Sequence, residues 1–357
     1  MAIRPEIQEA ISWYSKNRLI YKALSKRVAN IVHEVLEAKK VNYHSVAHRA
    51  KSLKSYKEKA SKEFYKNPIF EIKDLAGIRI ITYTSNDAQK VFDIIRKTFE
   101  IHPEDIVDKS QELGTDKVGY RSIHCIGNLG KDRGKLPENI VFKNMCFEIQ
   151  IRTILQHAWA EFEHDRNYKF GGVLPKEIKR RLSVLAGTLE LLDKEFDDLS
   201  REIDNYALEV KEKTETGDLD IPIDSTSLKA YMYKKFGPLV RLGVKPYFDQ
   251  FDKQLLNELS IMKIRSIKDL DDIVPKDYIE KKSKLLPDEQ YKGSFFGILI
   301  DIMIIHGMDT YFNKVLEDTA LGLDERYIEF YKGYGLNIDK YSNRILLFPP
   351  KSKAKGS

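Results

Sequence analysis

Two acidic side chains, Asp74 and Glu148, occur beside short β-branched stretches of this 357-residue chain. Asp74 precedes IRIITY at residues 78–83, and Glu148 lies within FEIQIRT at residues 147–153. Two carboxylates from neighbouring strands of one sheet supply the hard oxygen ligands that Mg²⁺ prefers, and they leave positions for water and substrate phosphates. Taken alone, the pair is better explained by a helix N-cap aspartate and a surface glutamate.

The stretch FEIQIRT places three polar side chains on one face of a strand, because successive side chains point to opposite faces. These are Glu148, Gln150 and Arg152. A carboxylate, an amide and a guanidinium that share one face predict a polar ligand opposite them.

Basic and hydroxyl side chains recur at a spacing of four in RAKSLKSYKEK, which begins at Arg49. If this stretch is helical, Lys51, Ser55 and Lys59 share one face. A hydroxyl between ammonium groups on one face is suited to binding phosphate. In GYRSIH, Tyr120 follows a glycine at a turn, where an exposed ring could stack on a base.

The elements around these residues predict an α+β fold with a mixed sheet of about five strands and flanking helices. The helices are indicated by apolar residues at spacings of three and four, and the strands by short β-branched runs between turn residues. Asn86 and Asp87 are the predicted caps of one helix. The predicted helices span residues 5–40, 47–65, 86–100 and 153–168, and the predicted strands span 78–83 and 122–129, with two more short pieces in VFKNMCFEIQI.

Apolar residues from Ile178 to Val210 alternate at spacings of four and three, which predicts one long helix over residues 176–212. We expect its stripe to pack on the catalytic domain or a second helix rather than in a coiled-coil dimer. The next stretch, KTETGDLDIPIDSTS, has no periodicity and is the predicted domain boundary. The predicted organisation is a catalytic domain at 1–212, a linker at 213–227, a mainly helical domain at 228–350 and a loose basic tail at 351–357.

The first 60 residues hold thirteen basic and five acidic side chains, so an anionic partner is expected there, with solvated helix faces as the alternative. The only cysteines are Cys125 and Cys146, which favours the cytoplasm and excludes a cysteine-based zinc site. The N-terminus lacks the apolar core of a signal peptide. The most apolar run, residues 295–305, contains Asp301 and predicts a core helix rather than a membrane span. We expect neither a membrane nor a DNA partner.

Residues from about 20 to 205 resemble the synthetase domain of the RelA/SpoT family, the alarmone synthetases, which have a nucleotidyltransferase-like fold. The matching motifs occur in the family's order: R-x-K-x3-S-x3-K at 49–59, D-L-A-G-I-R at 74–79, G-Y-R-S-I-H at 119–124, and F-E-I-Q-I-R-T with H-A-W-A-E-x-E-H-D-x-x-Y-K at 147–169. The resemblance implies transfer of the β,γ-pyrophosphate of ATP to a ribose 3′-hydroxyl, with AMP as the other product.

Motif position also implies a role for each site residue. Asp74 and Glu148 resemble the Mg²⁺ ligands, and Glu148 resembles the base that accepts the proton of the attacking hydroxyl. Arg49 and Arg79 resemble the pair that sandwiches adenine, Lys51, Ser55 and Lys59 resemble the phosphate ligands, and the expected acceptor side chains are Lys117, Tyr120, Arg121, His124, Gln150 and Arg152.

Two further sequence features bear on what the resemblance implies. His157, Glu161 and His164 lie on one helix face and could bind zinc, although the resemblance implies that this segment supports the active site. No histidine and aspartate cluster precedes residue 20, so we do not expect the hydrolase half of the bifunctional members.

The extension beyond the long helix resembles the antitoxin domain of CapRel-type defence proteins. In those proteins, a fused synthetase modifies the 3′ CCA end of tRNA and thereby stops translation. YKGY at 331–334 resembles the paired-tyrosine motif of that domain. The resemblance implies that Tyr331 and Tyr334 block the ATP site until a phage protein engages the domain. An aromatic stripe packed in a core, shared with Tyr327, is the alternative.

Three functions follow from these observations. The first is a self-inhibited pyrophosphokinase that modifies tRNA. The second is a guanosine tetra- and pentaphosphate synthetase that uses GDP or GTP and carries an extra domain. The third is a catalytically inactive RNA-binding or phage-sensing module, which the presence of both Asp74 and Glu148 argues against.

Overall fold

Two compact units make up the chain, Met1–Arg201 and Glu202–Ser357. The predicted boundary at 213–227 falls inside the second unit and stays a prediction. The computed structural model describes residues 4–108, 122–169, 174–248, 252–286, 293–316 and 319–348.

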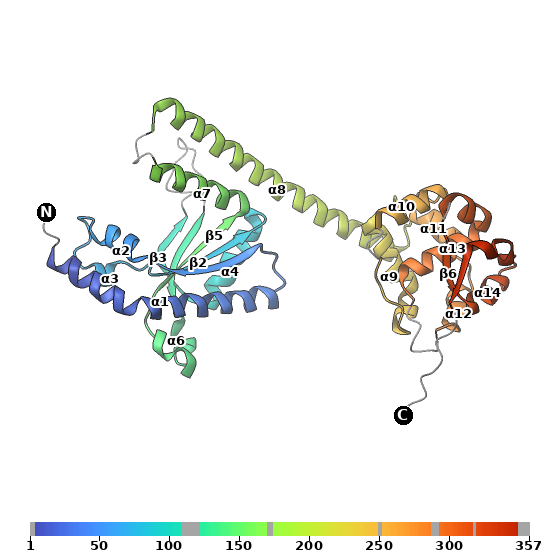
Figure 1. Ribbon diagram of the computed structural model, residues 1–357, viewed down its shortest axis with the longest axis horizontal. Coiled ribbons are helices and arrows are strands. Elements are labelled where there is room, and N and C mark those ends of the chain that lie inside the picture. The colour runs from blue at the N-terminus through green and yellow to red at the C-terminus, as the bar shows by residue number, and fades with distance from the viewer. Residues whose placement is uncertain are drawn as a thin grey trace. The chain divides into compact units, whose positions relative to one another are not determined.

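The first unit is built on a five-stranded sheet with the strand order β1-β2-β5-β4-β3 (Figure 1). The β2 and β5 strands are parallel, and the other neighbours are antiparallel, so the sheet is mixed. The predicted α+β class with a mixed five-stranded sheet is confirmed. The strands span Ser45–Ala50 (β1), Ala76–Thr82 (β2), Glu100–Asp108 (β3), Ile123–Asn128 (β4) and Phe147–Thr153 (β5).

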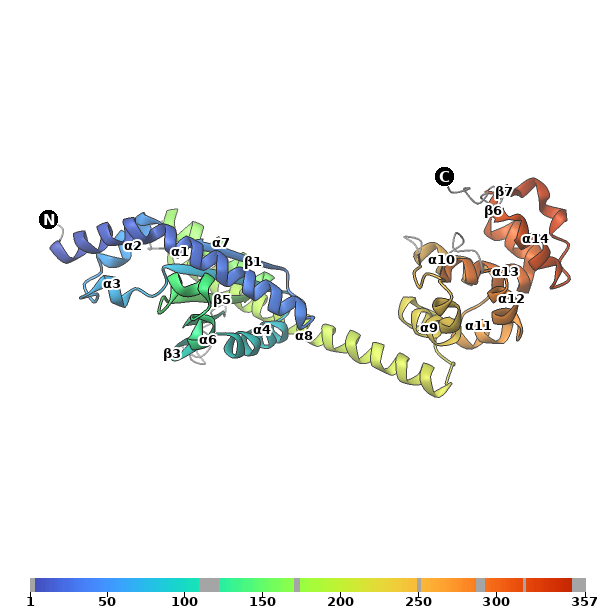
Figure 2. The ribbon, with the colours of Figure 1, turned by 90° about the horizontal axis from the view of Figure 1, so that it is seen from below.

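Helices cover both faces of this sheet. On one face, α1 and α4 pack their apolar residues against the strands and form the core, which contains Leu24, Val91 and Ile149. Figures 1 and 2 both show α1 along this face and α7 on the other. The helices of this unit span Pro5–Ala38 (α1), Leu53–Ala60 (α2), Pro68–Glu71 (α3), Ser85–Thr98 (α4), Gly130–Arg133 (α6), Ile154–Lys169 (α7) and, continuing into the second unit, Lys176–Thr216 (α8), with a 3-10 turn at Pro137–Phe142 (η1).

The predicted helix over 47–65 is wrong in its first part. Residues Ser45–Ala50 form the edge strand β1, which pairs with β2 along its whole length, and α2 begins only at Leu53. Ser52 caps α2 by accepting a hydrogen bond from the backbone N–H of Ser55. Lys51 therefore precedes the helix and does not share its face, because tertiary strand pairing outweighs the local spacing.

Two smaller predictions also need correction. The helix after β2 is capped by Thr84, whose side chain accepts from the N–H of Asp87, and not by Asn86 or Asp87. The two short strand pieces predicted in VFKNMCFEIQI are one 3-10 turn and the single strand β5. The β3 strand was not predicted. Its sequence, EIHPEDIVD, is rich in charged residues, and its pairing with β4 changes register between Ile101 and Ile106.

The long helix α8 forms as predicted, but its apolar stripe is largely uncovered. Within the described residues, Leu192, Phe196 and Leu199 are 41%, 46% and 54% exposed. The helix is attached to the first unit by polar contacts instead, since Thr153 Oγ1 donates to Asp193 at 2.8 Å. The predicted packing of the stripe on the catalytic domain is therefore wrong for most of its length, and packing on a second helix stays a prediction.

The second unit is mainly helical, with a small parallel sheet of β6 and β7. Its core gathers apolar residues from every one of its long helices, including Phe236, Leu259 and Ile302. Its elements span Ser225–Arg241 (α9), Asp252–Ile261 (α10), Ile267–Ile273 (α11), Tyr278–Ser283 (α12), Phe295–Thr310 (α13), Tyr311–Val315 (η2), Leu321–Asp324 (β6), Glu325–Lys332 (α14), Ile338–Arg344 (η3) and Ile345–Phe348 (β7).

By length and composition alone, Phe295–Val315 is long and apolar enough to cross a membrane, but half of its most apolar part is buried inside the unit. Asp301 lies in this stretch at 2% exposure and pairs with Lys282. A buried ion pair and a buried apolar face are the features of a core helix, in agreement with the sequence.

Candidate active site

The floor of the candidate site is the face of the sheet opposite the core. In β5 the burial alternates: Phe147, Ile149 and Ile151 are buried, while Glu148 and Gln150 are partly exposed on the other face. This alternation was expected from FEIQIRT, and it follows from the pleat of the strand.

Strand pairing places candidate site residues of β1, β2 and β4 next to Glu148 and Gln150 of β5. Gln150 of β5 pairs with Arg79 of β2 on one side and with His124 of β4 on the other. Glu148 pairs with Gly77, which in turn pairs with Arg49 of β1. Glycine leaves the floor open between Arg49 and Glu148, because it has no side chain there.

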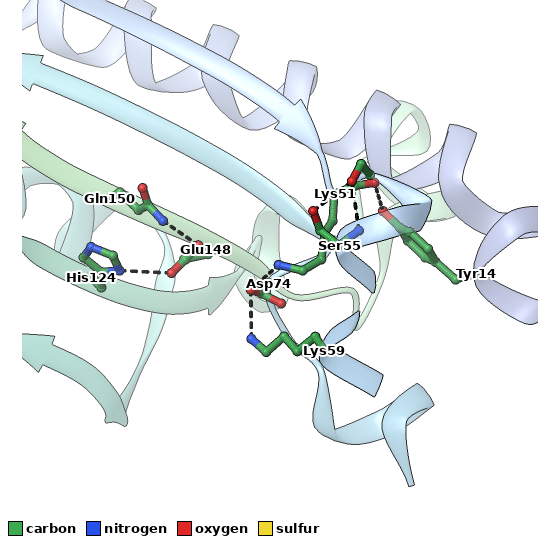
Figure 3. Close-up of polar contacts among 9 residues, drawn as sticks. Tyr14, Lys51, Ser55, Lys59, Asp74, His124, Glu148 and Gln150 are labelled. Carbon is green, nitrogen blue, oxygen red and sulfur yellow. Dashed lines mark hydrogen bonds and ion pairs between the residues drawn. The ribbon is translucent and has the colours of Figure 1, made fainter. Parts of the chain in front are cut away.

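Asp74 is held by two lysines at the edge of this floor (Figure 3). Lys51 Nζ and Lys59 Nζ both contact Asp74 Oδ2, at 2.6 and 2.9 Å. Burial works to raise the pKa of Asp74, but the two ammonium groups outweigh it and the pKa lies below its ordinary value. Asp74 is therefore ionised at neutral pH.

The other oxygen, Asp74 Oδ1, is buried and has no hydrogen-bond partner within the described ranges. A buried carboxylate oxygen without a partner is costly, so such an atom points to a ligand.

Glu148 is held by its neighbours on the sheet. His124 Nδ1 lies 3.1 Å from Glu148 Oε1, and Gln150 Nε2 donates to Glu148 Oε2 at 2.9 Å (Figure 3). Arg152 Nη2 lies 3.4 Å from His124 Nε2, so both histidine contacts are satisfied when Nδ1 carries the proton. Burial works to raise the pKa of Glu148, yet its contacts with His124 bring it below the ordinary value.

A cavity of about 300 Å³ joins these groups. Its lining includes Arg49, Lys51, Asp74, Arg79, Glu148 and Gln150. A larger cavity of about 580 Å³ lies elsewhere in the first unit, between α4 and α8, with Ile123 and Ile151 in its lining. We place the chemistry in the smaller cavity, because there two ionised carboxylates and several cations face one space.

Arg79 is oriented by a residue of α7. Its Nη1 lies 2.7 Å from Glu161 Oε1, and His157 Nδ1 lies 3.8 Å from the same oxygen. Because Glu161 is engaged by Arg79, the structure favours a supporting role for this segment over zinc binding. The side chain of His164 lies outside the described residues.

Comparisons with known proteins agree with this geometry. Residues 48–173 match the family described as a region found in RelA/SpoT proteins. The chain is 32% identical over 166 residues to the GTP pyrophosphokinase YjbM of Bacillus subtilis, a match that covers 44% of this chain and 72% of that protein. The chain belongs to the RelA/SpoT family. It is a pyrophosphokinase of the RelA/SpoT type.

Further relatives match between 37% and 54% of this chain. The GTP pyrophosphokinase YwaC of Bacillus subtilis is 31% identical over 136 residues, which cover 37% of this chain and 60% of YwaC. The crystal structure of small alarmone synthetase 1 from Bacillus subtilis is 26% identical, with a TM-score of 0.46, and covers 54% of this chain and 98% of that one. The crystal structure of the same synthetase bound to its product pppGpp is also 26% identical, with a TM-score of 0.46, and covers 54% of this chain and 99% of that one.

The RelA/SpoT motifs indicate the site residues, but two positioning groups on α1 could not be found from them. Tyr14 donates its hydroxyl to the backbone oxygen of Lys51 at 2.8 Å, and Arg18 Nε donates to the same oxygen at 3.1 Å. The Tyr14 ring also lies 4.4 Å from the ring of Tyr56 on α2. These contacts fix the junction of β1 and α2, from which Lys51 and Lys59 reach Asp74.

The predicted RelA/SpoT site residue Ser55 is not in the lining of the cavity. Ser55 is exposed on α2, where its hydroxyl bonds to Ser52. Lys117, Tyr120 and Arg121 lie outside the described residues.

The predicted blocking role of Tyr331 needs correction. Its side chain is fully buried in the second unit, and its hydroxyl donates to Asp301 Oδ1 at 2.7 Å. Tyr327 is also buried, and its hydroxyl oxygen accepts a hydrogen bond from Lys282 Nζ at 2.5 Å. Tyr331 thus has the core role that was the alternative, while Tyr334 is half-buried with Lys281 Nζ 4.0 Å from its ring centre.

Proposed function

We propose that this pyrophosphokinase transfers the β,γ-pyrophosphate of ATP to a ribose 3′-hydroxyl, with Asp74 and Glu148 as its catalytic carboxylates. The observation that carries the proposal is the unpartnered, buried Oδ1 of Asp74, whose other oxygen is shared by two lysines. Glu148 lines the same cavity. An anionic donor and a divalent cation together match this set of charges.

Asp74 and Glu148 are the residues that would hold Mg²⁺. Both carboxylates have lowered pKa values, so both offer ionised oxygen, the donor type that Mg²⁺ requires. When bound, Mg²⁺ neutralises charge on the phosphates and orients them for in-line attack.

The side chains around the cavity have separable tasks. Lys51 and Lys59 bind the phosphates, and an ammonium released from Asp74 by the incoming anion keeps its charge beside the reacting groups. Arg49 and Arg79 bind the adenine by stacking.

Glu148 is ionised and therefore able to accept the proton of the 3′-hydroxyl, and His124 fixes its direction. Gln150, Arg152 and His124 form the acceptor side of the floor, and we assign Lys117, Tyr120 and Arg121 to the acceptor as well.

We propose the 3′ CCA end of tRNA as the acceptor, so that modification stops translation. The excess of basic side chains in the first 60 residues supports a phosphate-rich partner. GDP or GTP is the second candidate, and it is favoured by the relatives that are named GTP pyrophosphokinases.

We further propose that residues 228–350 form an antitoxin-like unit that holds the enzyme inactive until a phage protein binds it. The unit lies outside the matched family region, which ends at residue 173, and it carries the YKGY motif. Tyr334 is its candidate blocking ring, because part of that ring is accessible. Two unpaired cysteines, Cys125 and Cys146, support a cytoplasmic location.

The experiment that tests the reaction is incubation of the chain with ATP labelled at its γ-phosphate, together with tRNA, GDP or GTP in separate tubes. Label on the 3′ end of tRNA supports the first acceptor, and label on the guanine nucleotide replaces it with the second. Asp74→Asn and Glu148→Gln should each reduce transfer by at least about 100-fold, while Asp132→Asn, an exposed acid on α6, should not. Full turnover in either amide variant would overturn the proposed mechanism.

A further inference from the structure

One loop of the first unit begins and ends at the candidate active site. Residues 61–71 connect α2 to the segment before β2, and the residues that flank this loop, Lys59 and Asp74, contact each other at 2.9 Å. Both ends of the loop therefore lie at the carboxylate that the reaction uses.

Two large aromatic rings on this loop are uncovered in the part of the chain that the structure describes. Phe64 is 68% exposed and Phe70 is 77% exposed. The loop itself is anchored from below, since Tyr65 and Ile69 pack on the small core formed by α1 and α2. The two phenylalanines are therefore presented to solvent by a segment that is packed on the core through other residues.

Cations accompany these rings. Lys62 and Lys66 are exposed, as are the acids Glu63 and Glu71 of the same loop, so the loop as a whole carries no net charge. Lys62 Nζ lies 6.0 Å from the centre of the Phe64 ring, so a cation adjoins this ring directly. The Phe64 and Tyr65 rings are 4.3 Å apart at an interplanar angle of 41°. Burial works to lower the pKa of Lys59, but Asp74 and, more weakly, Tyr65 raise it above the ordinary value. The aromatic pair thus adjoins a charged lysine of the site.

Exposed rings interleaved with lysines are the composition that binds single-stranded nucleic acid, since bases stack on the rings and phosphates meet the ammonium groups. We propose that Lys62, Phe64, Lys66 and Phe70, here called the aromatic–lysine loop, bind the unpaired nucleotides at the 3′ end of an RNA acceptor. This inference rests on the proposed RNA acceptor and adds the surface that selects it.

Direct binding to the intact chain tests the loop without turnover. The probe is a fluorescent RNA oligonucleotide that ends in CCA, measured by anisotropy at several salt concentrations. Phe64→Ala with Phe70→Ala should weaken binding by about tenfold for each ring. Lys62→Gln with Lys66→Gln should reduce the slope of log Kd against log salt by about one per lysine. The matched control is Leu19→Ala, at a side chain 74% exposed on α1, which should bind as the parent does.

A kinetic measurement separates this inference from the proposed acceptor. The ring variant should raise the KM for tRNA with no change in the KM for ATP. Should the parent chain label GDP or GTP and leave tRNA unlabelled, the acceptor proposal fails, and the oligonucleotide measurement still decides whether the loop binds RNA.

Equal RNA binding by the parent and by the ring variant would overturn the inference. Ring-dependent binding to anionic lipid vesicles without RNA binding, or to a protein partner alone, would likewise overturn it and assign the loop to that other surface.

Discussion

Glu161 of α7 holds Arg79 of β2 through an ion pair of 2.7 Å between Oε1 and Nη1. Arg79 shares its face of the sheet with Arg152, whose pKa is lowered by burial and by the nearby Arg79 charge. Glu161 therefore offsets repulsion between two guanidinium groups and sets the direction of one of them. Glu161 is a positioning residue, because it acts on the proposed adenine site only by orienting Arg79.

Glu161→Gln should raise the KM for ATP about five- to tenfold and change kcat less, since a charged hydrogen bond contributes about 1.5–3 kcal/mol at most. Steady-state kinetics at saturating acceptor measure this split. Glu163→Gln, an exposed neighbour on the same helix, is the control. A fall in kcat without a change in KM would contradict the positioning role.

Tyr14 fixes the carbonyl of Lys51 from α1. Tyr14→Phe deletes that hydrogen bond and should cost about 1 kcal/mol of unfolding free energy while weakening ATP binding several-fold. Urea unfolding followed by tryptophan fluorescence, with calorimetric titration of a non-hydrolysable ATP analogue, measures both effects. Tyr21→Phe removes a hydroxyl from a partly buried ring of the same cluster and should leave nucleotide affinity as it is. If the two variants behave alike, the Lys51 junction is not what Tyr14 controls.

Lys282 and Asp301 form a buried ion pair of 2.5 Å in the second unit, with side chains 2% and 3% exposed. Tyr278 and Tyr331 donate to the two oxygens of Asp301, so the carboxylate is fully used. Lys282→Met leaves a buried charge without its counter-ion and should destabilise the unit by about 3–5 kcal/mol.

Hydrogen exchange of residues 202–357 measures this loss, and tryptophan fluorescence is an internal control, because Trp13 and Trp159 both belong to the first unit. Lys284→Met, at a side chain 69% exposed, should have little effect. Equal protection in both lysine variants would refute the stabilising role of the pair.

Asp271 gives the second unit a predictable pH dependence. Burial works to raise its pKa, but Lys235 and Tyr231 hold it below the ordinary value. Its contribution is therefore complete above the unfolded pKa of about 4 and is lost as the pH falls through the folded pKa. Asp271→Asn should cost about 1 kcal/mol at pH 7, and the difference from the parent should shrink below pH 4. Denaturant titrations at pH 7 and pH 3 test this, with Asp272→Asn as the exposed control; a difference that grows in acid would contradict it.

The sequence predicted best the parts in which local pattern and tertiary structure agree. FEIQIRT alternates strictly, and its strand lies where the sheet needs one buried and one polar face. The stretch 47–65 shows the reverse, since SVAHRA has helix-compatible spacing but serves as an edge strand paired with β2. Edge pairing depends on a partner some thirty residues away along the chain, which spacing alone cannot reveal.

The site was predictable in its residue types but not in its contacts. Motif spacing brought Lys51, Lys59 and Asp74 together correctly, although the predicted common helix face was wrong. Tyr14 carried no signal, because an apolar-periodic helix offers no reason to single out one tyrosine hydroxyl. The exposed stripe of α8 was equally hidden, since periodicity shows that a face is apolar but not what covers it.

The two tyrosines of YKGY should behave differently, because one is in the core and the other is half exposed. Tyr331→Phe removes one hydrogen bond from a buried carboxylate and should destabilise the second unit by about 1–2 kcal/mol without raising transfer activity. Tyr334→Ala removes the accessible ring that Lys281 caps and should raise transfer activity in the intact chain if that ring blocks the ATP site. Labelled transfer and hydrogen exchange, measured side by side, separate the two effects. Activation by Tyr334→Ala with unaltered protection of residues 202–357 supports self-inhibition through Tyr334. Activation by both variants in proportion to lost protection would show instead that the folded unit inhibits as a whole and that neither ring acts as a plug.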